Sequence, residues 1–111
     1  MNWYIAKVVF RINHVGKPQF DEHLRLIAAR NYEEAFKKAR LLGISEEDSF
    51  LDNRQHPVRW EFVNIADLYP IDQLTDGIEL HSSIREEEEA APYIRSIHQK
   101  AVDIESGLFP N

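Results

Sequence analysis

The chain has 111 residues, with 19 acidic against 13 basic side chains and a formal net charge of −6 at neutral pH. A chain of this length forms one ordinary domain with a core of its own, and the absence of cysteine excludes disulfides, thiol nucleophiles and cysteine-ligated metal sites. The negative charge disfavours nucleic acid and anionic membranes as partners.

The first segment, residues 3–13, places apolar side chains at every second position and predicts a strand. One of its faces is apolar throughout, whereas the other grades from apolar to polar. Gly16 and Pro18 then indicate a hairpin loop, and residues 20–29 alternate again. We therefore expect these two segments to pair as an antiparallel hairpin.

The next segment predicts a helix that begins after Asn31 and ends near Gly43. Asn31 is a suitable N-cap with Glu34 three positions later, and the apolar side chains that follow have helical spacing. Residues 44–56 show no clear period. We expect them to be irregular, with a single helical turn starting at Ser45.

A second hairpin is expected in the third quarter of the chain. Residues 58–65 alternate as a strand, and the consecutive apolar pair at 62–63 indicates a bulge or burial on both sides. Pro70 cannot continue a central strand, so the residues around it are expected to form a connection. The Asp-Gly turn at 76–77 then leads into a fourth strand over residues 78–84.

A second helix is expected in the C-terminal quarter. Four consecutive acids at 86–89 precede it, and its first residue is expected to be Ala90 or Ala91 because proline belongs in the first helical turn. A stripe of apolar residues with helical spacing continues until the helix ends near Gly107. We expect the tail at 108–109 to pack back over the last turn.

The predicted element order is ββαββα, in a single α+β domain spanning residues 1–111. Two hairpins, each followed by a helix, predict a two-layer sandwich in which a four-stranded antiparallel sheet carries both helices on one face.

The apolar runs of the chain are short. Lys7 interrupts the first run before it reaches the length of a signal peptide, and no run approaches the roughly 20 apolar residues of a membrane span. We therefore expect a soluble, cytoplasmic protein with no membrane partner.

Two tryptophans are the strongest candidates for a binding surface. The second face of the first strand carries Trp3, Ile5 and Val9, and it needs cover because the helices are expected on the other face. Trp60 is the second anchor, since tryptophan is enriched at binding hot spots. A protein partner or a second copy of the chain is the simplest cover.

A cationic strip of Lys7, Arg11 and Arg25 is expected beside Trp3 on the outer face of the first hairpin. Sheets that bind single-stranded nucleic acid combine cations with stacking aromatic residues in this way. However, neighbouring acids such as Glu22 would neutralise the strip, the net charge has the wrong sign, and no RNA-binding signature is present. Nucleic acid is therefore not the expected partner.

Four polar residues of the predicted second hairpin, Asp67, Asp76, Glu79 and His81, form a candidate metal site. Carboxylates can hold Mg²⁺ in a hydrolase, and Glu79 and His81 share one strand face to which His23 could add a ligand. Turn formation and loop capping account equally well for the two aspartates, and a solvated sheet face accounts for the other two residues. We therefore expect no cofactor, and the sequence leans against enzymatic activity.

Several segments carry a resemblance to a known family over nearly the whole chain. They are Trp3-Tyr4-Ile5-Ala6-Lys7, Leu24-Arg25-Leu26-Ile27, Tyr32-Glu33-Glu34-Ala35-Phe36-Lys37-Lys38-Ala39, Trp60-Glu61-Phe62, Asp67-Leu68 and Asp76-Gly77-Ile78-Glu79-Leu80. In this combination they resemble a small bacterial family, the domain of unknown function 4288. The resemblance implies bacterial origin and a small stand-alone domain, and it implies no catalytic residue.

The leading hypothesis is a non-enzymatic module that works through protein–protein contact and self-associates through the open sheet face. One alternative is an immunity-type inhibitor that masks a basic toxin nuclease with the acidic stretches 46–52 and 86–89. Another alternative is a metal-dependent enzyme that uses the acidic cluster of the second hairpin.

Overall fold

The computed structural model describes residues 1–107 and contains two compact units, Met1–His81 and the segment from Ser82 onward. The prediction for the tail at 108–109 lies outside the described residues. The first unit holds the sheet and one helix, and the second holds the other helix. The α+β class and the ββαββα order are confirmed.

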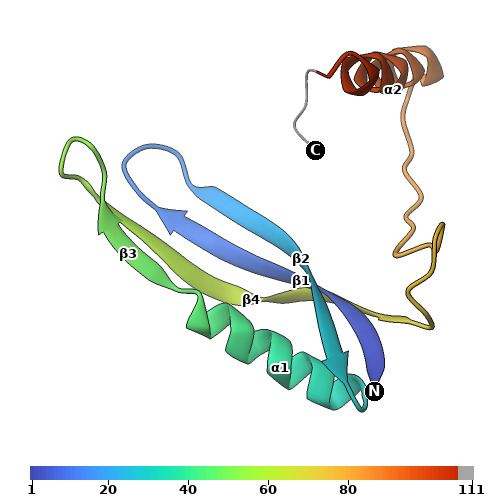
Figure 1. The fold of residues 1–111 in the computed structure, drawn as a ribbon. Coiled ribbons are helices and arrows are strands. Elements are labelled where there is room, and N and C mark those ends of the chain that lie inside the picture. Colours follow the sequence, from blue (N-terminus) through green and yellow to red (C-terminus); the bar gives the residue numbers. More distant parts are fainter. Residues whose placement is uncertain (108–111) are drawn as a thin grey trace. The chain divides into compact units, whose positions relative to one another are not determined.

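The first unit is built on an antiparallel sheet of four strands in the order β2-β1-β4-β3 (Figure 1). The strands are β1 (Asn2–Asn13), β2 (Gln19–Ala29), β3 (Asp48–Leu51) and β4 (Pro57–Ile71). The expected first hairpin is confirmed, and β1 and β2 pair along nearly their whole length. β1 lies between β2 and β4, so both of its edges are hydrogen-bonded to neighbouring strands.

The second hairpin is real but consists of different residues from those expected. It joins β3 to β4, whereas residues 78–84, predicted as a strand, have no regular structure in the described chain. The prediction of an irregular stretch at 44–56 missed β3. The physical reason is Asp52, whose carboxylate accepts hydrogen bonds from two backbone amides and so closes a tight turn directly after β3.

The prediction that Pro70 ends the strand is also wrong, because β4 runs on to Ile71. β3 pairs only with residues 57–60, so β4 is an edge strand at Pro70 and can accommodate a residue without an amide hydrogen. The predicted bulge is confirmed. Phe10 pairs with Phe62 and Val9 pairs with Asn64, which leaves residue 63 without a partner.

Helix α1 (Tyr32–Ser45) begins as its sequence predicts. The Asn31 side chain accepts a hydrogen bond of 2.8 Å from the Glu34 amide. The helix ends two residues later than expected, because Gly43 is a packing residue inside it: a Cβ atom there would lie 2.4 Å from the Phe62 ring. Glycine at this position therefore sets the close approach of α1 to β4.

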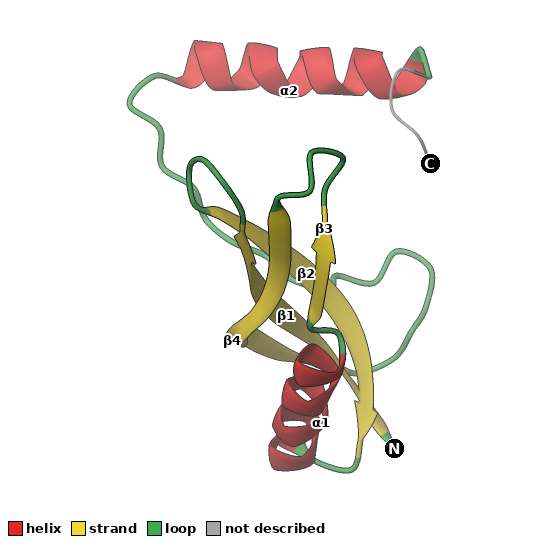
Figure 2. Ribbon diagram, turned by 90° about the vertical axis from the view of Figure 1, so that its left-hand side faces the viewer, coloured by secondary structure: helices red, strands yellow, loops and turns green. Residues whose placement is uncertain are grey.

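The core lies between α1 and one face of the sheet, which we call the inner face (Figure 2). β1 contributes its alternate apolar residues, and Phe10 is the largest fully buried side chain. Ala35 and Ala39 let the helix approach the strands closely. The buried members of this cluster are Tyr4, Ala6, Val8, Phe10, Ile27, Ala29, Ala35, Ala39 and Leu68.

The second unit contains α2 (Ala90–Glu105), which begins at one of the two expected residues. Glu89 takes the N-cap position without a side-chain hydrogen bond, and no residue of α2 is buried. Its apolar stripe, which includes Ile94, Ile97 and Ile104, is exposed. That this helix lies on the sheet stays a prediction. Neither helix in the described residues has the length and apolar character needed to cross a membrane.

Candidate functional site

The face of the sheet opposite α1, here called the outer face, carries the apolar residues that the sequence assigned to a binding surface. Trp3, Ile5 and Val9 alternate with the core residues of β1 and therefore project to this side. In the β1–β2 register, Leu24 lies opposite Lys7 and Leu26 lies opposite Ile5, so β2 adds its own apolar residues to the outer face.

The exposed apolar surface of the outer face is concentrated on β2. Leu24 is 67% exposed, Phe20 58%, Leu26 45% and Trp3 37%. Ile5, in contrast, is only 7% exposed. β2 is also an edge strand, so its outward-facing backbone groups have no strand partner in the described chain. We call Phe20, Leu24 and Leu26 of β2, together with Trp3 of the neighbouring β1, the β2 patch.

The β4 side of the outer face is partly covered by the chain itself. The His81 ring stacks on the Tyr69 ring, with centroids 4.0 Å apart. Tyr69 lies beside Ile5 in the register, so the segment after β4 returns to the sheet next to this buried side chain. Loss of solvent around Tyr69 and its hydrogen bond to Asp67 raise the pKa of its hydroxyl.

The expected cationic strip is divided between the two faces. Lys7 and Arg11 lie on the outer face, where Lys7 forms an ion pair of 2.8 Å with Glu22 that raises the lysine pKa. Arg25 was wrongly grouped with them. It pairs with Ala6 in the register and therefore lies on the inner face, where it forms a bidentate ion pair with Glu46. The antiparallel register explains this separation. Leu24 lies opposite Lys7 and shares its face, so the next residue, Arg25, projects from the opposite face.

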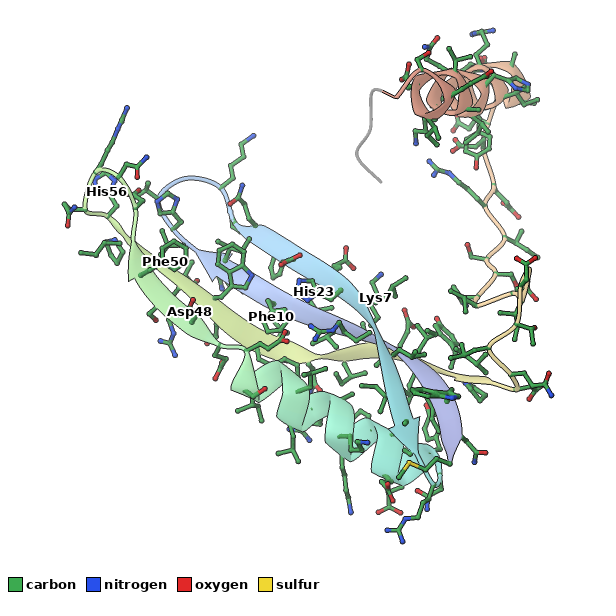
Figure 3. All side chains as sticks on the ribbon, viewed as in Figure 1. Lys7, Phe10, His23, Asp48, Phe50 and His56 are labelled. Carbon is green, nitrogen blue, oxygen red and sulfur yellow. The ribbon has the colours of Figure 1, made fainter. Side chains whose placement is uncertain are left out.

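Trp60 also lies on the inner side rather than with Trp3. Its indole nitrogen donates a hydrogen bond of 3.2 Å to Asp21, and its ring stacks on Phe50. Figure 3 shows Phe50 beyond the end of α1, on the same side of the sheet as Phe10 and His23, whose rings are 5.1 Å apart. Trp60, Phe50, Phe10 and His23 help to line a hollow of about 540 Å³. Trp60 is therefore no part of the outer face.

The candidate metal set is not brought together. The structure brings no three of Asp67, Asp76, Glu79 and His81 together within the described residues. Asp67 accepts the hydrogen bond from Tyr69, and His81 stacks on that same ring. His23, which the sequence offered as an additional ligand beside Glu79 and His81, lies on the inner side with its Nε2 atom 2.7 Å from Asp21.

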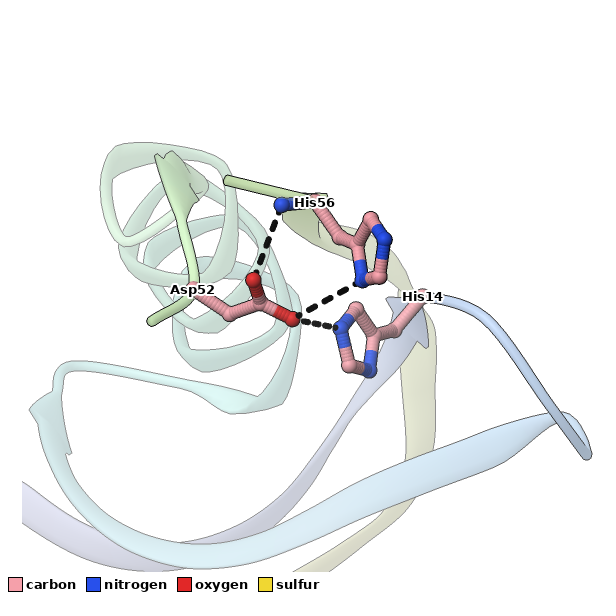
Figure 4. Close-up of side chains that lie close together, drawn as sticks. All are labelled: His14, Asp52 and His56. Atoms are coloured by element: carbon pink, nitrogen blue, oxygen red, sulfur yellow. Dashed lines mark hydrogen bonds and ion pairs between the residues drawn. The ribbon is translucent and has the colours of Figure 1, made fainter. Parts of the chain in front are cut away.

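A different cluster, of His14, Asp52 and His56, lies at the tips of the two hairpins (Figure 4). His14 directly follows β1, whereas Asp52 and His56 bracket the turn between β3 and β4. The tips meet because β1 and β4 are neighbours and their last pair is Asn13 with Arg59. His14 Nε2 lies 2.7 Å from Asp52 Oδ2, and His56 Nδ1 lies 3.6 Å from the same oxygen.

The carboxylate of Asp52 is the centre of this cluster. Its Oδ1 atom accepts hydrogen bonds of 2.8 Å from the backbone amides of Arg54 and His56, which leaves Oδ2 to face the two imidazoles. Donation from the His56 amide and from His14 lowers the pKa of Asp52 to about 2, since both contacts favour the ionised carboxylate. Gln55 has a φ of 64°, which keeps the turn tight enough for both amides to reach.

Sequence reasoning missed this cluster because it missed β3. Once residues 48–51 are recognised as a strand, the Asp52–His56 spacing marks the tip of a hairpin. The meeting with His14 also requires the strand order β2-β1-β4-β3, which places two loops far apart in sequence side by side. No local pattern in the sequence encodes that order.

A protein-family model with the description "Domain of unknown function (DUF4288)" matches residues 3–82. This span corresponds closely to the first unit, with its sheet and α1. No curated protein and no solved structure matches the chain.

Proposed function

The chain belongs to the DUF4288 family, and we propose that it acts as a non-enzymatic interaction module that associates with a second copy of itself. The single observation that carries this proposal is the β2 patch, a group of large apolar side chains exposed along a sheet edge. An unpaired edge strand is a template for pairing with another strand. Three of the four patch residues, Phe20, Leu24 and Leu26, lie on this edge strand.

The two edges of the sheet differ in how well they suit pairing. β3 has four residues, a length typical of edges that are protected from pairing. β2 has 11 residues and no proline. Antiparallel pairing of β2 with β2 of a second copy would give a two-fold symmetric contact in which each copy presents the same residues. Apolar side chains around Leu24 would then form one strip across both copies.

Local charge supports this contact in spite of the net charge of −6. The ionisable side chains of β2 already have partners within the chain. Arg25 is bound to Glu46, Glu22 to Lys7, and His23 to Asp21. Two β2 strands would therefore bring few unpaired charges together. Most of the acidic residues that produce the negative net charge lie outside β2.

The test is sedimentation equilibrium of the full chain over a wide concentration range, with EDTA present to exclude metal-mediated contacts. We expect a species of twice the 13.0 kDa chain mass. Leu24→Lys places a charge in the centre of the β2 patch and should return the monomer. The matched control is Leu51→Lys, which changes a similarly exposed leucine, 58% against 67%, on the opposite edge and should leave association unchanged.

Two results would overturn the proposal. One is a wild-type chain that remains monomeric at the highest concentration. The other is a Leu24→Lys variant that associates as the wild type does, since association would then use another surface.

A further inference from the structure

We propose that His14, Asp52 and His56 form a binding site for a single zinc-class divalent metal ion that joins the two hairpin tips. The site is separate from the β2 patch and does not depend on self-association. Its three ligand atoms, His14 Nε2, Asp52 Oδ2 and His56 Nδ1, all lie within 4.8 Å of one another (Figure 4). Among the described residues, it is the one group of three or more such side chains that meets this spacing.

The separations between the ligand atoms are close to those of a metal site. A hydrogen bond at 2.7 Å joins Asp52 Oδ2 to His14, but His56 Nδ1 stands 3.6 Å from that oxygen, too far for a second one. A tetrahedral zinc ion with bonds of about 2.1 Å holds neighbouring ligand atoms about 3.4 Å apart. The two separations from Asp52 Oδ2 lie on either side of that value, and the two imidazole nitrogens lie within 4.8 Å of each other. Side-chain rotations can therefore bring the three ligand atoms toward one ion.

The carboxylate is already oriented as metal ligands usually are. Backbone amides of Arg54 and His56 bind Oδ1 and direct Oδ2 toward the imidazoles, which is how outer hydrogen bonds hold a ligand in metal sites. His14 and Asp52 come from loops on neighbouring strands, so the sheet fixes the spacing between the two tips.

The chemistry of the donor set identifies the class of metal. Two imidazole nitrogens and one carboxylate oxygen suit Zn²⁺ and the neighbouring transition metals, whereas Mg²⁺ and Ca²⁺ prefer oxygen ligands throughout. Binding uses the tautomers in which the ring protons of His14 and His56 sit on Nδ1 and Nε2, respectively. The side chains are 24–47% exposed, so an ion can enter from solvent and retain one position for water.

The test is isothermal titration of the chelator-treated full chain with zinc chloride, with Co²⁺ absorption as a second readout. We expect one equivalent of zinc to bind. His14→Ala and His56→Ala should each lower the affinity at least about tenfold. His98→Ala, on α2, is the matched control because it removes a histidine outside the cluster and should bind zinc as the wild type does.

A third variant separates ligation from folding. Asp52→Asn keeps one oxygen to accept the two backbone amides of the turn but replaces Oδ2 with an amide group. It should lose zinc binding while circular dichroism in EDTA stays that of the wild type. Zinc binding of unchanged affinity in the two histidine variants, or no binding by the wild type, would overturn the proposal and leave the β2 patch unaffected.

Discussion

The inner and outer faces of the sheet belong to the same strands but differ in what surrounds them. On the inner face, α1 and the strands bury Phe10 and Val8 to 1% exposure. On the outer face, Leu24 of the neighbouring strand stays 67% exposed. The difference indicates that folding of the first unit depends on the inner face, whereas the outer face is free to serve contacts with other molecules.

The largest effect should follow from removing the central side chain of the inner face. Phe10→Ala leaves a cavity beneath α1 and should lower the free energy of unfolding by about 3–5 kcal/mol. That is a large part of the stability of a small domain. Urea unfolding followed by circular dichroism measures it. A loss below about 1 kcal/mol would contradict the assignment of the core to this face.

A smaller loss is expected where α1 and β4 approach most closely. Gly43→Ala adds a methyl group that would lie 2.4 Å from the Phe62 ring, so the helix or the ring must move. We expect a destabilisation of about 1–3 kcal/mol, although alanine is the better helix former. Gly43→Ala in a Phe62→Leu background, compared with Phe62→Leu alone, should cost less because the ring is gone.

The ion pair of Arg25 and Glu46 should contribute less still, and its contribution should depend on pH. The hydrogen bond from Arg25 lowers the pKa of Glu46 below its usual value of 4.5. A carboxyl with a lowered folded-state pKa stabilises the fold above its unfolded pKa, and this stabilisation is lost as the pH falls through the folded pKa. Glu46→Gln should therefore cost up to about 1 kcal/mol at pH 7 and progressively less as the pH falls below the usual pKa of 4.5.

Melting temperatures of the two proteins across this pH range measure the difference. The matched control is Glu33→Gln, because Glu33 pairs with Lys37 on the solvent side of α1 at 79% exposure. That variant should follow the wild type at every pH. A constant gap between Glu46→Gln and the wild type from pH 7 to pH 3 would show that the glutamate acts through something other than its charge.

The sequence predicts the inner face well because the signals are local. Alternation along β1, the Asn31 cap and the apolar spacing of α1 are properties of neighbouring residues, and the structure confirms them. The register of β2 is different, because it depends on the loop length between two strands. The predicted cationic strip is therefore split between the two faces of the sheet, with Arg25 on the inner face and Lys7 on the outer face.

The hairpin tips could not be predicted because they depend on strand order. β3 has four residues and no buried side chain, so no periodic pattern marks it. Residues 78–84 alternate more clearly but have no strand in the structure, which shows that alternation without a partner strand is insufficient. The cluster of His14 with Asp52 and His56 requires both the β3–β4 hairpin and the order of the strands. Both depend on contacts between segments that are distant in the sequence.

The smallest effect on stability should come from the outer face, and β2 offers two nearby residues that test this directly. Ile27 is 5% exposed on the inner face, and Leu24 is 67% exposed on the outer face. At concentrations where the chain is monomeric, Ile27→Ala should cost about 2–5 kcal/mol, whereas Leu24→Ala should change the free energy of unfolding by about 0.5 kcal/mol or less. Urea unfolding of both variants side by side measures the contrast. If Leu24→Ala were as costly as Ile27→Ala, Leu24 would be part of a core, and its exposed surface would no longer be available to a second copy of the chain.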